Sequence, residues 1–176
     1  MNYQRLFLSV FTAVLVTFIV ANPVQSEDLK PEILQALANG DTAQAITFLE
    51  KEIGLDPSYH LNYYTLGEIY FKREMIAKAL AQFTIALDKK SKHYESLYLQ
   101  AICQLRLGQI DEAEKGMQKG LSKARDLKAE FQNGMGLILM AREKYDESLN
   151  YLLQAVNADT ANADYHINVG DAYYFM

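Results

Sequence analysis

The stretch LNYYTLGEIYF, residues 61–71, places apolar side chains at positions typical of a tightly packed helix. Leu61, Tyr64 and Ile69 can supply its apolar faces. Gly67 lies in the middle of the stretch, although a glycine destabilises a helix interior by about 1 kcal/mol relative to alanine. The glycine therefore needs a packing reason, and similar positions elsewhere in the chain supply it.

Small residues recur within helical stretches at a period of 34 or 35 residues, and two further series share this period. The three series are Gly67, Ala101, Gly136 and Gly170; Ala45, Ala79, Ala113 and Ser148; and Leu49, Phe83, Met117 and Leu152. Repetition at this length is typical of stacked helix pairs. Leu, Ala, Glu, Lys and Gln, which favour helices, also dominate after residue 27, so we predict an all-α protein.

The repeated residues resemble the tetratricopeptide repeat, in which Leu-Gly, an aromatic residue, Ala, Phe and Ala stand at fixed positions of a 34-residue unit. Residues 60–93 fit this pattern best, through Tyr63, Leu66, Gly67, Tyr70, Ala79, Phe83 and Ala86. The resemblance implies an α-solenoid of stacked antiparallel helix pairs: four units over residues 26–59, 60–93, 94–128 and 129–162, and the first helix of a fifth over 163–176.

In such a unit the two helices cross closely, and a small residue on each helix makes room for the contact. The pattern therefore predicts that Gly67 meets Ala79 and that Gly136 meets Ser148. Between the first two helices, Gly40 should end one helix and Asp41 should cap the next.

The first 26 residues have the three-part pattern of a secretory signal peptide. A basic start, MNYQR, precedes the apolar run LFLSVFTAVLVTFIV at residues 6–20, and Val24 and Ser26 suit a cleavage site before Glu27. An uncleaved membrane anchor is the alternative. We expect residues 27–176 to be a repeat domain exported to the periplasm or cell envelope, or secreted or lumenal in a eukaryote, with membrane contact only through an uncleaved signal segment.

Charge and motifs exclude several function classes. The formal charge of −5 and the lack of a basic stretch argue against a nucleic-acid partner. The three histidines lack metal-site spacing, and we interpret His60 and His93 as solvated loop residues. Cys103 suits a small buried hydrophobe. We find no catalytic motif, no carboxylate pair in an apolar setting, no cofactor motif and no evident small-molecule substrate, so we predict a protein that is not an enzyme.

The resemblance implies that partners bind a concave groove lined by defined positions of each first helix. Inter-repeat packing is the alternative role for some of these residues, such as Ile102 and Leu105, and we expect about half of the lining to be reachable. The predicted partner-binding residues are Tyr64, Glu68, Phe71, Lys72, Tyr98, Ile102, Leu105, Arg106, Asn133, Leu137, Met140, Ile167, Asp171 and Tyr174.

This lining predicts an aromatic and aliphatic groove with few charges, and it lacks the Lys, Asn and Arg set by which chaperone-binding relatives hold a terminal carboxylate. A protein partner that presents apolar or aromatic side chains, as an extended peptide or an amphipathic helix, suits it better. We therefore predict an exported interaction scaffold or adaptor. The alternative is the N-terminal binding region of a longer enzyme or transport component whose active domain lies beyond residue 176.

The sequence ends in AYYFM, which is unlike a polar cap. Repeat arrays usually close with a polar outer face, so the pattern predicts that a further helix follows Met176. The alternative is that the helix over residues 163–176 caps the array itself.

Overall fold

A computed structural model describes residues 29–176. The predicted signal peptide, residues 1–26, lies outside the described residues. All regular secondary structure from residue 29 onward is helical, which confirms the all-α repeat fold. The chain divides after Cys103 into two compact units, whose described parts are residues 29–103 and 104–176. Within residues 29–176, no helix combines the length and the apolar character needed to cross a membrane.

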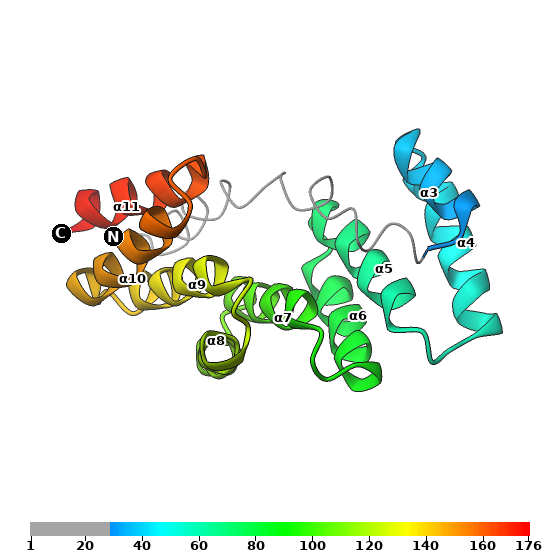
Figure 1. Cartoon of the computed structure of the whole chain (residues 1–176), viewed down its shortest axis with the longest axis horizontal. Coiled ribbons are helices and arrows are strands. Elements are labelled where there is room, and N and C mark those ends of the chain that lie inside the picture. The colour runs from blue at the N-terminus through cyan, green and yellow to red at the C-terminus, as the bar shows by residue number, and fades with distance from the viewer. Residues whose placement is uncertain (1–28) are drawn as a thin grey trace. The chain divides into compact units, whose positions relative to one another are not determined.

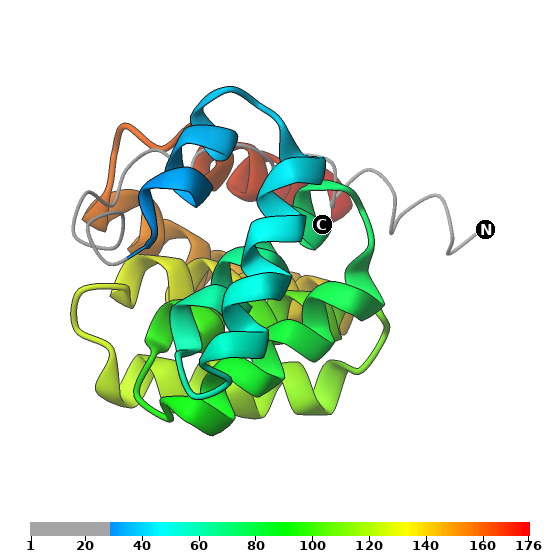
Figure 2. The ribbon, with the colours of Figure 1, turned by 90° about the vertical axis from the view of Figure 1, so that its right-hand side faces the viewer.

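The helices of the first unit are α3 (Pro31–Ala38), α4 (Thr42–Leu55), α5 (His60–Lys72), α6 (Ile76–Lys89) and most of α7 (Tyr94–Arg106). Pro31 begins α3, where its fixed φ suits the first helical turn. Figures 1 and 2 show α3 and α4 side by side, and α4 packs on α5. Their shared core consists of Ile33, Ala36, Ala45, Leu49, Leu66 and Ile69.

Each turn within a helix pair contains one residue in the left-handed region, at the same place in the repeat. These residues are Gly40 (φ 72°), Glu74 (φ 58°), Gly108 (φ 77°) and Glu143 (φ 61°). Asp41 then caps α4, since its side chain accepts the Gln44 backbone N–H at 2.9 Å, as predicted. The turn geometry is thus common to the pairs, while glycine is used in only two of them.

The crossing of α5 and α6 confirms that Gly67 serves close packing. A Cβ on Gly67 would lie 2.7 Å from Cε1 of Phe83, and the three nearest atoms all belong to the Phe83 ring. The ring therefore fills the space above the glycine. At the equivalent crossing of α9 and α10, a Cβ on Gly136 would overlap the Leu152 side chain. The Ser148 Oγ donates a hydrogen bond to the Gly136 carbonyl at 2.8 Å, which confirms the predicted contact between these two residues.

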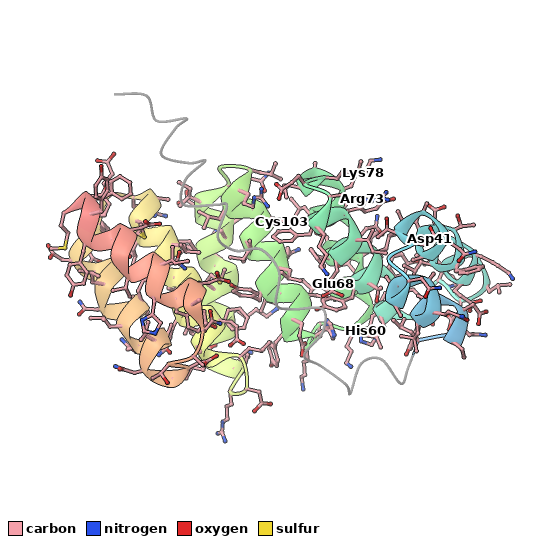
Figure 3. All side chains as sticks on the ribbon, turned by 90° about the horizontal axis from the view of Figure 1, so that it is seen from above. Asp41, His60, Glu68, Arg73, Lys78 and Cys103 are labelled. Atoms are coloured by element: carbon pink, nitrogen blue, oxygen red, sulfur yellow. The ribbon has the colours of Figure 1, made fainter. Side chains whose placement is uncertain are left out.

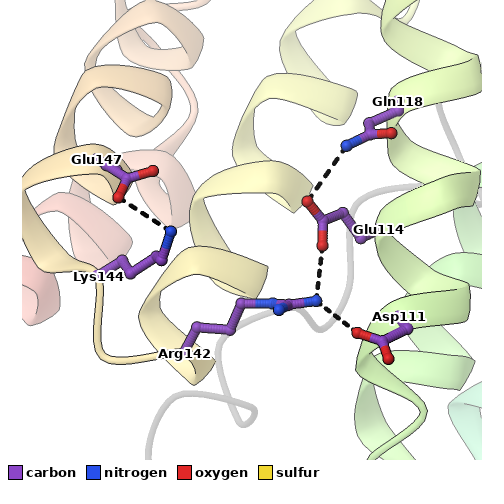
Figure 4. Close-up of polar contacts among 6 residues, drawn as sticks. All are labelled: Asp111, Glu114, Gln118, Arg142, Lys144 and Glu147. Carbon is purple, nitrogen blue, oxygen red and sulfur yellow. Dashed lines mark hydrogen bonds and ion pairs between the residues drawn. The ribbon is translucent and has the colours of Figure 1, made fainter.

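The second unit contains α8 (Ile110–Lys123), α9 (Lys128–Ala141), α10 (Tyr145–Ala158) and α11 (Ala163–Phe175). Residues 131–140 of α9 are all buried, because α8, α10 and α11 pack around this helix. At its outer end, Arg142 Nη2 lies 2.6 Å from Asp111 Oδ1 and 2.7 Å from Glu114 Oε2 (Figure 4). This cationic bridge ties the end of α9 to the first turns of α8.

Candidate functional site

The predicted partner-binding residues are divided between the two units, so two surfaces are described separately. The first surface, on α5 and α7, comprises Tyr64, Glu68, Phe71, Lys72, Tyr98 and Ile102. The second surface, on the end of α7, α9 and α11, comprises Leu105, Arg106, Asn133, Leu137, Met140, Ile167, Asp171 and Tyr174.

The reachable part of this lining is more charged than the sequence indicated. The eight buried residues are Tyr64, Phe71, Tyr98, Ile102, Leu105, Asn133, Leu137 and Met140. The six that keep a partly or fully exposed side chain are Glu68, Lys72, Arg106, Ile167, Asp171 and Tyr174. Because the apolar side chains mostly serve packing, four of the six reachable residues are charged, which corrects the expectation of a groove with few charges.

A buried tyrosine and a partly exposed carboxylate form the centre of the first surface. The Tyr64 hydroxyl donates a hydrogen bond to Glu68 Oε1 at 2.9 Å, one helical turn along α5. Burial raises the pKa of Glu68 from 4.5 to about 7, which outweighs the stabilising Tyr64 hydrogen bond and the attraction of Lys72; the charge of Glu95 raises it further. Glu68 is therefore a carboxyl that titrates near neutral pH. Figure 3 shows it on α5, together with His60.

His93 belongs to the same cluster, and the prediction of a solvated loop histidine is wrong for it. Its side chain is 4% exposed and packs edge-on against the rings of Tyr64, at 4.8 Å, and His60, at 4.9 Å. His60 itself is partly buried at the start of α5. Both residues turn inward from the repeat boundary because the two rings pack on each other and on Tyr64.

The hydrogen bonds of His93 fix its protonation. The Ser96 N–H donates to Nδ1 at 3.3 Å and the Ser96 Oγ lies 2.7 Å from the same nitrogen, so we assign the ring proton to Nε2. Nε2 lies 3.6 Å from Glu95 Oε2. Burial, followed by the charges of His60 and Lys90, lowers the pKa of His93 to about 3, so the ring that faces Glu95 is neutral at physiological pH.

The second surface has an amide pair in place of this titratable cluster. Asn168 Nδ2 donates to Asn133 Oδ1 at 2.8 Å, and both side chains are buried. The Asn168 Oδ1 is buried and accepts no hydrogen bond within residues 29–176. Beside this pair, α11 presents two exposed apolar side chains, Ile167 at 46% and Tyr174 at 83%. This surface therefore combines neutral polar groups with apolar contact area.

No set of three His, Cys, Asp or Glu side chains in the described part of the chain gathers as metal ligands. Cys103 is fully buried, in keeping with its interpretation as a small hydrophobe. The sequence reasoning missed three polar residues of the two surfaces, His93, Ser96 and Asn168. In the sequence, these three residues share one feature: each is polar and lies directly before, or in the first two turns of, the first helix of a repeat unit.

Comparison with known proteins supports a helical-repeat relationship. A family model for subunit 3 of the anaphase-promoting complex, or cyclosome, matches residues 36–120. No curated protein sequence matches this chain.

Several solved structures share the fold. A tetratricopeptide repeat protein from Parabacteroides merdae is similar over 89% of this chain and 60% of its own, with 18% identity and a TM-score of 0.75. MamA from Desulfovibrio magneticus, from residue 41 to its end, is similar over 88% of this chain and 86% of its own, with 17% identity and a TM-score of 0.73. YrrB, a repeat protein with an unusual peptide-binding site, is similar over 81% and 73%, with 23% identity and a TM-score of 0.66.

Proposed function

Because the chain is a tetratricopeptide-repeat protein, we propose that it is a non-catalytic interaction module that binds a protein partner through an extended peptide or a helix. The two surfaces on the first helices are the proposed contact regions. We further propose that the protein acts as a scaffold or adaptor in the periplasm or cell envelope, on the basis of the signal-peptide pattern of residues 1–26.

The observation that carries this proposal is the pair of exposed apolar side chains on α11. Ile167 and Tyr174 lie two helical turns apart, on the side of α11 that also carries Gly170, and a Cβ on Gly170 would meet no atom within 4 Å. Two large apolar side chains on one exposed helix face can anchor a partner, because their burial on binding removes apolar area from water. The peptide-binding site of YrrB, whose fold is similar, supports the same class of partner.

The test uses a library of random twelve-residue peptides selected on the full chain, followed by calorimetry with synthetic copies of the selected peptides. Tyr174→Ala should weaken the binding of peptides that contact the second surface by more than about 1 kcal/mol, because it removes an exposed aromatic anchor, and it should leave peptides that contact the first surface unaffected. The matched control is Leu55→Ala, since Leu55 is 70% exposed at the end of α4 and lies outside both surfaces. Equal losses in both variants, or a selection that yields no peptide, would contradict the proposal.

Export is tested separately. Protein made in a secreting host should begin at or near Glu27 when its N-terminus is sequenced. Recovery of a soluble cytosolic form that retains Met1 would argue against export, without affecting the binding proposal.

A further inference from the structure

Glu68 of the first surface and Glu95, beside it on α7, are partly buried carboxylates without a Lys or Arg side chain within 4 Å in the described part of the chain, as are Asp164 and Asp171 on α11. Elsewhere, Glu52, with a side chain 13% exposed, pairs with Lys30 at 3.6 Å, and Glu114, at 27%, pairs with Arg142 at 2.7 Å. Glu95, whose side chain is 22% exposed, faces the neutral ring of His93.

Contacts through Tyr64 and His93 connect the two carboxylates. The Tyr64 ring packs on the His93 ring with centroids 4.8 Å apart, and His93 Nε2 lies 3.6 Å from Glu95 Oε2. In keeping with this arrangement, the charge of Glu95 raises the pKa of both Glu68 and Tyr64. The Tyr64 hydroxyl holds Glu68 Oε1, and Glu68 itself remains partly exposed. The fold therefore keeps two carboxyl groups together in aromatic surroundings, where ionising both costs free energy without a cation.

We propose that Glu68 and Glu95 bind a basic side chain, Lys or Arg, of the peptide partner, and that Tyr64 positions Glu68 for this contact. The inference rests on the proposed function and specifies the chemistry of its partner. A guanidinium or ammonium group placed between two carboxylates replaces their mutual repulsion by charge-assisted hydrogen bonds. The nearby aromatic rings of Tyr64 and His93 keep the contact poorly solvated, which strengthens it.

The other charged groups around this position do not already fill the role. Lys72 attracts Glu68 from one turn further along α5, but it is exposed and lies beyond ion-pair distance. His93 stays neutral because burial lowers its pKa to about 3, and Tyr64 stays protonated because burial raises its pKa well above 10. A bound cation should lower the pKa of Glu68, so binding near pH 7 should release about half a proton from its carboxyl group.

The experiment takes the selected peptides whose affinity Tyr174→Ala leaves unchanged, and it compares each of them with a copy in which its basic residue is replaced by norleucine. The selected peptides should be enriched in Lys or Arg next to apolar residues. Replacement of the basic residue by norleucine should weaken peptide binding to the wild-type protein at least tenfold. On a Glu68→Gln variant the same replacement should change the affinity less than threefold. Glu50→Gln is the matched control, because Glu50 is an exposed carboxylate on α4, and it should behave as the wild type.

Calorimetry in phosphate and in Tris buffers at pH 7 then measures the proton release. About half a proton should be released by the wild type and by Glu50→Gln, and none by Glu68→Gln. Selected peptides without basic residues would overturn this inference and leave the proposed function intact. The same holds if the norleucine copies bind the wild type as tightly as the original peptides do. A selection that yields no peptide would instead contradict the proposed function itself.

Discussion

The first and second surfaces have the same helical framework but different chemistry. In the first, Tyr64, Glu68 and His93 form a cluster in which burial moves the pKa of all three members toward the neutral form. In the second, Asn133 and Asn168 form a neutral amide pair. The first surface can respond to charge and pH, whereas the second offers hydrogen bonds and the exposed apolar side chains of α11.

The helix crossings beneath the two surfaces, unlike the surfaces themselves, are alike. A glycine on the first helix receives a large side chain of the second helix in both units: Phe83 at Gly67 and Leu152 at Gly136. The repeat period therefore preserves the packing that holds the helices together, while the lining above it varies. Packing residues and lining residues lie at different positions of the same helix, so separate variants can test each set.

The largest expected effect on stability is at the crossing of α5 and α6. Gly67→Leu should destabilise the protein by about 3 kcal/mol, because even a Cβ would lie 2.7 Å from the Phe83 ring. Gly54→Ala in α4 is the matched control: a Cβ there meets nothing within 4 Å, so the gain in helix propensity should stabilise by up to about 1 kcal/mol. Urea denaturation measures both changes. Similar effects in the two variants would contradict the crossing described above.

The next largest effect is a pH dependence of stability that we expect from the first surface. The folded-state pKa of Glu68, about 7, lies above its ordinary 4.5, so its contribution to stability is present below pH 4.5 and is lost as the pH rises through 7. His93 has the opposite sign: its folded-state pKa, about 3, lies below 6.5, so its contribution is present above pH 6.5 and is lost as the pH falls toward 3.

Glu68→Gln should therefore stabilise the protein at pH 8 by about 2 kcal/mol relative to the wild type, and hardly at all at pH 4. Denaturation midpoints at the two pH values give the difference. The control Glu50→Gln should show no such pH-dependent gain, and a gain for Glu68→Gln of equal size at both pH values would argue against burial as the cause.

The amide pair of the second surface should show coupling without pH dependence. Asn133→Leu leaves the Asn168 Nδ2 buried without its acceptor, which should cost about 1–3 kcal/mol. The double variant Asn133→Leu/Asn168→Leu replaces both polar groups and should recover most of that loss. A double-mutant cycle by urea denaturation measures the coupling, and additive losses would show that the two side chains act independently.

The smallest effect is at the turns. Glu143→Gly should stabilise by about 0.5 kcal/mol, because glycine tolerates the φ of 61° that a side chain does not, although it also raises the entropy of the unfolded chain. Gly108→Ala, at the equivalent turn with φ 77°, should destabilise by about 1 kcal/mol. Thermal melts of the two variants should shift in opposite directions.

The sequence predicted the fold because its information is periodic. The recurrence of Gly67, Gly136 and their partner series requires stacked helix pairs whatever the detailed packing. It did not predict how closely the Phe83 ring covers Gly67, because the direction of a large ring depends on the space left by its neighbours. The turn before α7 gave no sign that His93 points inward, since side-chain direction at a loop depends on tertiary contacts.

The lining was the least predictable feature. Positions on a helix follow from spacing, but burial follows from which neighbours cover them, and Tyr64, Tyr98 and Leu137 are covered. The absence of an ion pair to Glu68 among residues 29–176 is a three-dimensional property with no local sequence signal. The predicted residues remain a hypothesis for partner binding, now concentrated on Glu68 in the first surface and on Tyr174 in the second.

The most direct test of cation binding at Glu68 is an NMR titration of its side-chain carboxyl carbon in the full chain, repeated with a saturating basic peptide from the selection. We expect a midpoint near pH 7 in the free protein and a clear fall in that midpoint when the peptide is bound. A midpoint near 4.5 in the free protein, or a midpoint near 7 that the peptide leaves unchanged, would contradict this expectation.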